Sequence, residues 1–152
     1  MAAEWKRFLI AVDETETSMR AVRYAGELVG PHQDIEILLI HVYPEPQPDY
    51  YRKGGTLRAY QEDKEASAGI LFGNVRNILE KKGISGNAIA VKAVMAEGKT
   101  LSQAIIDEQK SGGFGTVILG KRGLSKAEEF LFGSISSALL HKTRDCAVIA
   151  VG

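Results

Sequence analysis

Residues 8–42 read FLIAVDETETSMRAVRYAGELVGPHQDIEILLIHV, two apolar runs separated by a segment of mixed polarity. The first run, residues 8–12, is apolar throughout and ends at Asp13, which is typical of a parallel strand buried on both faces. The second run, residues 35–42, has the same character, and a proline-rich stretch beginning at Pro44 follows it. Proline stops a strand and favours an extended loop. The two runs therefore predict two strands of one parallel sheet.

The segment between the two runs predicts a helix. Its apolar residues recur at helical spacing: Val22, Ala25 and Val29. We expect the helix to run from about Thr17 to Gly30-Pro31, where the glycine would take a left-handed cap and the proline could not continue the helix. Strand, helix and strand together form one β-α-β unit.

The alternation continues through the rest of the chain. A longer helix is predicted by an apolar stripe that ends at Gly83: Ala68, Leu71, Phe72, Val75, Ile78 and Leu79. Further strands are predicted at residues 89–95, 116–119 and 147–151, the last one preceded by a helix that carries Ile135.

The helix between residues 95 and 116 has clear start and stop signals. Thr100-Leu101-Ser102-Gln103 predicts a capping box, in which the two outer side chains satisfy unpaired helix amides. The stretch Gly112-Gly113-Phe114-Gly115 predicts its end.

This order of elements predicts a single domain over residues 1–152. The fold class is α/β, a Rossmann-like three-layer α/β/α arrangement with a five-stranded parallel sheet and right-handed crossovers. Alternation alone does not give the order of the strands. We adopt 3-2-1-4-5 as a hypothesis because it makes the first and fourth strands neighbours, and ligands of such sheets bind where the strand order reverses.

Composition excludes several classes of function. Nineteen basic and nineteen acidic residues balance, so no global field draws the chain to nucleic acid or to an anionic membrane, and we expect neither as a partner. Cys146 is the single cysteine, which is compatible with a reducing compartment, and the first seven residues lack the layout of a signal peptide. We therefore expect a cytoplasmic protein.

The glycines after the fourth strand are suited to binding phosphate. Gly120, Gly123 and the pair Gly133-Ser134 would bring backbone amides, a hydroxyl and a helix N-terminus to one edge of the sheet. The alternative is that the glycines serve only turns and that Ser134 only caps a helix.

The run from Gly120 to Ser134 resembles the nucleotide-binding signature of the ATP-binding universal stress proteins, glycine-two-glycine-nine-glycine-serine. The likeness extends over nearly the whole chain, through residues 10–13, His41-Val42, Gly98 and the tail 146–151. It implies an adenine nucleotide alpha hydrolase-like fold that binds ATP, ADP or AMP, with magnesium or manganese as a possible companion.

The resemblance also implies which residues bind the nucleotide: Ala11, Val12, Asp13, Val42, Leu119, Gly120, Gly123, Gly133, Ser134 and Ile135. It further implies a homodimer through the last strand, around Val148, Ile149 and Val151. Two residues depart from the usual pattern, Glu14 beside the ligand and Lys121 in the glycine loop. If Glu14 points inward, its charge weakens phosphate binding.

We therefore predict a nucleotide-dependent switch or sensor in the stress response, whose protein partner the sequence does not identify. The alternatives are a slow ATPase and a dimeric interaction protein that binds no nucleotide. No catalytic residue and no metal ligand is assigned: His32, His41 and His141 are scattered, and Cys146 has the character of a packed residue. The segment from Pro44 to Ala66 is predicted to be a surface loop, with a lid over the nucleotide as an alternative.

Overall fold

The computed structural model describes residues 4–30, 32–121, 135 and 137–152. Its elements follow one another in the order η1 (Glu4–Lys6), β1 (Arg7–Ala11), α1 (Glu16–Val29), β2 (Glu36–Pro44), α2 (Pro48–Arg52), α3 (Leu57–Lys81), η2 (Gly86–Ala88), β3 (Ile89–Ala96), α4 (Leu101–Gly112), β4 (Thr116–Gly120) and β5 (Ala147–Val151). Residues 137–142, shortly before β5, are also helical.

The five strands form one parallel sheet in the order β3-β2-β1-β4-β5, which confirms the predicted fold class and strand order. In the central strand, Leu9 lies between Leu38 of β2 and Val117 of β4. The chain moves outward from β1 to β3 and then returns to the other side of β1. The strand order therefore reverses between β1 and β4.

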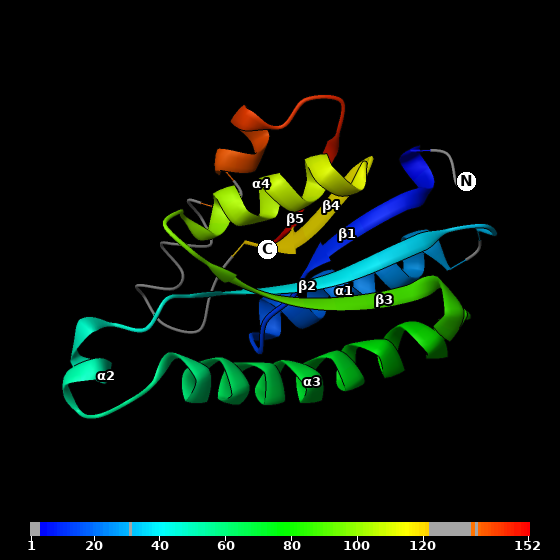
Figure 1. Ribbon diagram of the computed structural model, residues 1–152. Coiled ribbons are helices and arrows are strands. Elements are labelled where there is room, and N and C mark those ends of the chain that lie inside the picture. Colours follow the sequence, from blue (N-terminus) through cyan, green and yellow to red (C-terminus); the bar gives the residue numbers. More distant parts are fainter. Residues whose placement is uncertain (1–3, 31, 122–134, 136) are drawn as a thin grey trace.

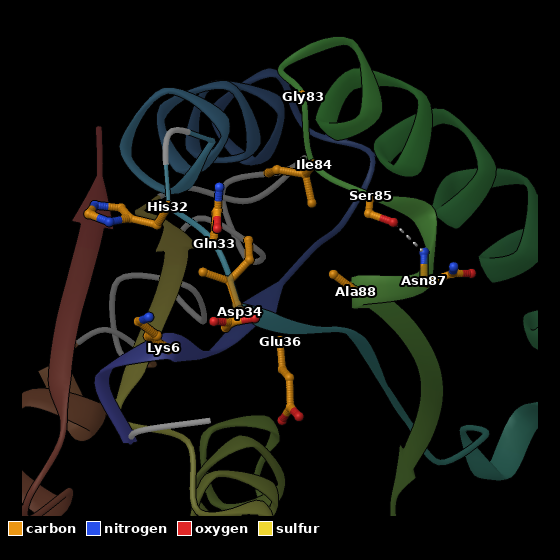
Figure 2. Close-up of a pocket in the computed structure, with 11 residues that line it drawn as sticks. Lys6, His32, Gln33, Asp34, Glu36, Gly83, Ile84, Ser85, Asn87 and Ala88 are labelled. Carbon is orange, nitrogen blue, oxygen red and sulfur yellow. Dashed lines mark hydrogen bonds between the residues drawn. The ribbon is translucent and has the colours of Figure 1, made fainter. Parts of the chain in front are cut away.

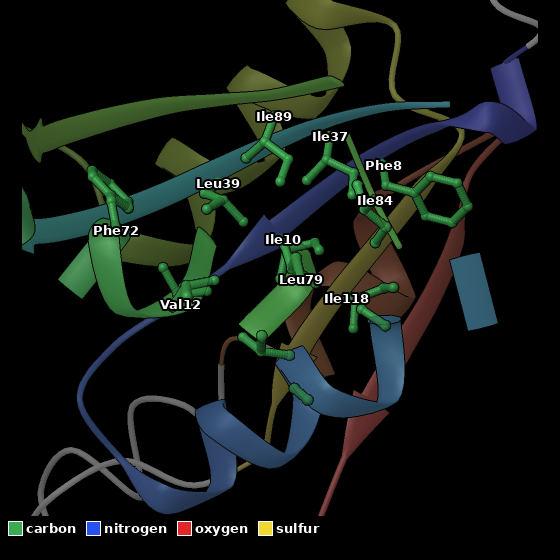
Figure 3. Packing of buried hydrophobic residues seen from close by; sticks show 14 of the residues in the cluster. Phe8, Ile10, Val12, Ile37, Leu39, Phe72, Leu79, Ile84, Ile89 and Ile118 are labelled. Atoms are coloured by element: carbon green, nitrogen blue, oxygen red, sulfur yellow. The ribbon is translucent and has the colours of Figure 1, made fainter. Parts of the chain in front are cut away.

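Helices cover both faces of the sheet, as predicted. Figure 1 shows α1 and α3 below the sheet and α4 above it, with the helical residues 137–142 on the same side as α4. Each face has its own buried cluster. The α1/α3 cluster includes Ile10, Leu39 and Ile118, whose side chains Figure 3 shows converging between the strands and the helices. The α4 cluster includes Leu9 and Val117 from the opposite face.

The burial of both faces explains the apolar runs of the sequence. Leu9 and Ile10 are consecutive residues and both are fully buried, because successive side chains of a strand point to opposite faces and here both faces are covered. The apolar stripe of α3 faces inward as predicted, with Leu71, Val75 and Leu79 buried.

The predicted left-handed cap of α1 is wrong. Gly30 has φ −50° and ψ −41°, which is right-handed helical geometry, and Pro31 lies outside the described residues. A Cβ atom on Gly30 would lie 2.7 Å from the carbonyl oxygens of Gly26 and Lys82. Glycine is required there because the end of α1 approaches the backbone at the end of α3.

The ends of α4 confirm one half of the capping prediction. The Thr100 hydroxyl accepts a hydrogen bond from the Gln103 amide at 3.1 Å. The reciprocal half is absent among the described residues, because the Gln103 side chain donates to Asp107 at 2.8 Å. At the other end Gly113 has φ 64°, a left-handed cap that only glycine adopts without strain.

The predicted loop between Pro44 and Ala66 is largely helical, so that prediction was wrong. It contains α2 and the first turns of α3, and Pro48 opens α2 at a position where its missing amide donor costs nothing. Two tyrosine hydroxyls hold the segment: Tyr50 donates to the Thr56 carbonyl at 2.9 Å and Tyr60 to the Pro44 carbonyl at 2.6 Å.

Candidate functional site

The carboxyl ends of β1 and β4 meet the first turn of α1. Gly120 ends β4, and a Cβ atom on it would lie 2.9 Å from the Ser18 amide nitrogen and 2.9 Å from the Thr17 carbonyl carbon. The glycine is therefore required by the approach of α1 to the strand end. This approach brings the positive end of the α1 dipole to the point where the strand order reverses.

A ring of hydrogen bonds joins the end of β1 to the start of α1. The Asp13 carboxylate accepts from the Thr15 amide at 2.8 Å and from the Thr15 hydroxyl at 2.5 Å. The Thr15 hydroxyl accepts from the Ser18 amide at 3.0 Å, and the Ser18 hydroxyl accepts from the Asp13 amide at 2.9 Å. Asp13 is only 7% exposed. Its carboxylate thus lies at the predicted edge and helps to begin α1.

Thr15 and Ser18 were not among the predicted site residues. The signal for them is present in the sequence, because a threonine is a favoured N-cap and here stands directly before the helix. The apolar spacing predicts a helix that begins at Thr17, two residues after the observed cap. Glu14, whose inward orientation would have opposed phosphate, is exposed, while Thr15 is buried.

The ladder between β1 and β2 stops just before this edge. Its last paired residues are Ala11 and Ile40, after which the Val12 amide still donates to the Ile40 carbonyl at 2.9 Å. The Val12 carbonyl is bonded by a side chain, since His41 Nδ1 lies 2.8 Å from it. The hydrogen-bonding groups of successive residues in a parallel strand alternate sides, so those of Val42, like those of Ile40, are directed toward the β1 side.

An aromatic row lies behind His41. The His41 and Tyr43 rings are stacked, with centroids 6.3 Å apart at 24°, and the Tyr60 ring lies 6.0 Å beyond Tyr43. Burial, and then the charges of Glu65 and Glu97, raise the pKa of Tyr43 above its ordinary value. The Tyr43 hydroxyl is therefore neutral at physiological pH.

The structure brings several of the predicted binding residues together. Three of them, Ala11, Leu119 and Ile135, belong to the buried α4 cluster, and Val42 packs against the same cluster. The side chains of Ala11, Leu119 and Ile135 are buried, so only their backbone atoms are available to a ligand at the sheet edge, whereas the Val42 side chain is half-buried. Three other predicted binding residues, Gly123, Gly133 and Ser134, lie outside the described part of the chain.

A separate hollow of about 880 Å³ lies at the opposite, amino-terminal edge of the sheet (Figure 2). Lys6, Asp34 and Glu36 are among the residues that line it, and Glu36 is paired with Arg7. Charges of both signs line it, and no predicted site residue contributes to it. Ligands of open parallel sheets bind at the carboxyl ends of the strands, so we do not place the site here.

The described residues offer no metal-binding group of three or more His, Cys, Asp or Glu side chains. No helix among them is long and apolar enough to cross a membrane. Cys146 is half-buried and packs against the α4 cluster, as predicted for a packed residue. Burial raises the pKa of its thiol, although a hydrogen bond from the Val117 backbone opposes the change.

Comparisons with known proteins agree with this fold. Residues 4–152 match the model of the universal stress protein family. Among solved structures, the chain is similar to universal stress protein UspA from Lactobacillus plantarum, with a TM-score of 0.77 and 16% identity over 99% of this chain and 100% of that one. No curated protein matches.

Two further similar structures contain nucleotides. One is a universal stress protein in complex with cAMP, with a TM-score of 0.65 and 16% identity over 99% of both chains. The other is the universal stress protein from Archaeoglobus fulgidus in complex with dAMP, with a TM-score of 0.63 and 16% identity over 99% of this chain and 100% of that one. At these identities the likeness establishes the fold.

Proposed function

This chain belongs to the universal stress protein family, and from that premise we propose that it binds an adenine nucleotide, as a switch or sensor in the stress response. The observation that carries the proposal is the arrangement at the carboxyl ends of the strands. The α1 N-terminus approaches the end of β4 at Gly120, where the strand order reverses, and the β1–β2 ladder ends before it reaches Val42. The complexes of similar proteins with cAMP and dAMP support adenine as the base.

The base would lie against Val42. That residue directs an amide donor and a carbonyl acceptor toward the β1 side, beyond the last ladder pair at Ala11 and Ile40. Adenine carries an amino donor beside a ring-nitrogen acceptor, which complements a donor and an acceptor on one strand edge. Guanine carries a carbonyl and a protonated ring nitrogen at the same positions. We therefore expect ATP to bind more tightly than GTP.

The phosphates would lie on the glycine loop. We assign them to Gly123 and to the amides of Gly133, Ser134 and Ile135, with the Ser134 hydroxyl as an additional donor. This assignment rests on the spacing of the signature. Magnesium or manganese is expected with the phosphates, and we assign the cation no protein ligand, since the described residues form no metal-binding group.

The binding test begins with protein purified without added nucleotide. Mass spectrometry of released ligand should detect an adenine nucleotide, and calorimetric titration with ATP should give micromolar affinity that Gly133→Val/Ser134→Ala abolishes. Lys110→Ala, which changes an exposed lysine in the last turn of α4, is the control and should bind as wild type does. If neither ligand nor binding is found, the glycines serve turns and the interaction-protein alternative stands.

Turnover is measured on the same protein. Phosphate release that stays stoichiometric with protein supports a binding module, whereas repeated turnover supports the slow ATPase. We place the protein in the cytoplasm, on the argument from its single cysteine.

We also propose that two copies pair through β5. This strand is an edge of the sheet, and its residues Val148, Ile149 and Val151 are half-buried although apolar. Pairing with a second copy across a two-fold axis would cover both the unpaired backbone groups and these side chains. A mass measured by light scattering at high concentration that equals one chain would remove this proposal.

A further inference from the structure

We propose that His41 is a positioning residue, whose imidazole holds the Val12 carbonyl and so leaves the Val42 amide available to the nucleobase. This inference rests on the proposed function, because it concerns the same site. It goes beyond that function because it attributes part of the affinity for the base to the His41 side chain. The backbone groups expected to contact the base belong to the next residue, Val42.

The first step is the break in the β1–β2 ladder. In a regular parallel ladder the next bond would run from the Val42 amide to the Val12 carbonyl, and it would pair Val12 with His41. Pairing instead ends at Ala11 and Ile40, and β1 ends at Ala11. The Val12 carbonyl accepts from His41 Nδ1 at 2.8 Å. A side chain therefore occupies the acceptor that the Val42 amide would otherwise use.

The second step is the protonation of the ring. A carbonyl oxygen can only accept a hydrogen bond, so Nδ1 must carry the proton in the neutral imidazole. The tautomer is thus assigned from its partner. A ring with its proton only on Nε2 could not make this contact, and it would leave the Val12 carbonyl to the Val42 amide.

The third step is the support behind the ring. Tyr43 stacks on His41 and is only 4% exposed, and Tyr60 contacts Tyr43 edge-on. The Tyr60 hydroxyl donates to the Pro44 carbonyl, and this hydrogen bond attaches the aromatic row to the end of β2. A positioning residue requires a side chain held by its neighbours, and these contacts hold His41 from one side.

The test uses the full chain with two substitutions. His41→Asn keeps an N–H donor near the position of Nδ1, whereas His41→Leu removes it. We expect His41→Leu to lose about tenfold in affinity for ATP and most of the preference for ATP over GTP. His41→Asn should stay within about threefold of wild type, because it preserves one hydrogen bond of ordinary strength. Binding of inorganic tripolyphosphate, which has no base, should be the same in all three proteins.

The outcomes separate this inference from the proposed function. If wild type binds ATP in preference to GTP and His41→Leu does so equally well, the inference is wrong while the proposed function stands. If His41→Leu loses affinity for ATP, GTP and tripolyphosphate to the same extent, the residue is merely structural and the inference is again wrong. If wild type binds no nucleotide, both fail.

A second measurement does not depend on any variant. The nitrogen chemical shifts of the His41 ring, recorded by NMR on wild type at mildly alkaline pH, should report the Nδ1-protonated tautomer. The Nε2-protonated tautomer would overturn the proposal even if the affinities behaved as expected, because that ring could not donate to Val12.

Discussion

Gly120 and Ser18, which end β4 and begin α1, approach so closely that a Cβ atom on Gly120 would lie 2.9 Å from the Ser18 amide nitrogen. The contact joins the two elements that border the proposed nucleotide site. It also gives Gly120 a structural role that is separate from any contact with phosphate.

Gly120→Ala is expected to destabilise the protein by about 1–3 kcal/mol, because the neighbouring atoms belong to a helix backbone that cannot move aside easily. The measurement is the free energy of unfolding in urea. Gly73→Ala is the matched control. Gly73 lies within α3 with nothing within 4 Å of its added Cβ, so alanine there should stabilise by about 0.5–1 kcal/mol. Equal effects of the two substitutions would contradict the close approach.

Thr15→Ala is expected to cost about 1–2 kcal/mol of stability, since its hydroxyl both accepts from the Ser18 amide and donates to Asp13. Thr56→Ala removes the cap of α3, where the hydroxyl accepts from the Ala59 amide at 3.2 Å in an exposed setting. This control substitution should cost less stability than Thr15→Ala does. Urea unfolding of both variants and of Thr15→Ser tests the comparison, and a larger loss for Thr56→Ala would refute the buried network.

Proline substitution in β5 should separate dimer formation from folding. The Ala147 amide donates to the Gly115 carbonyl and the Val151 carbonyl accepts from the Lys121 amide, so residues 147, 149 and 151 direct their backbone groups to β4. Val148 and Ala150 therefore direct theirs outward. Ala150→Pro removes one outward donor and should give a folded monomer by light scattering.

Ile149→Pro is the control for that experiment. It removes a donor that faces β4 and should destabilise the fold itself. A dimer that persists in folded Ala150→Pro would show that the copies do not pair through the β5 backbone.

Burial raises the pKa of the Cys146 thiol, so its alkylation should be slow at pH 8. Iodoacetamide labelling followed by mass spectrometry should be several-fold faster in 6 M urea, where the pKa returns to its ordinary value. A raised pKa in the folded state also means that the thiol's contribution to stability is full below the unfolded pKa and is lost as the pH rises through the folded one. Labelling at equal rates in both conditions would contradict the burial.

Sequence patterns predicted the strands well because buried parallel strands consist almost wholly of apolar residues. The predicted limits of β5, residues 147–151, coincide with the observed ones, and those of β3 differ by one residue. The patterns failed where an outcome depended on contacts distant in sequence. Gly30 was predicted to be a local left-handed cap, but glycine is required there by the close approach of the Lys82 backbone, which is distant in sequence.

The same distinction holds for the residues of the candidate site. Asp13 and Gly120 could be placed at one edge from the order of elements alone. The role of His41 could not, because its contact with Val12 depends on the register of β1 against β2 and on the point where their ladder ends. The helix α2 was missed because its five residues are too few to produce a periodic pattern.

A line of aromatic contacts runs from the segment between β2 and α3 to the site. Tyr50 contacts Tyr60, Tyr60 contacts Tyr43, and Tyr43 stacks on His41, which binds the Val12 carbonyl. Substitutions of residues in direct contact along such a line do not add independently. A change on the exterior of α2 would then alter the binding constant of a nucleotide that it never touches, so sequence variation in this segment would adjust the concentration at which the protein responds.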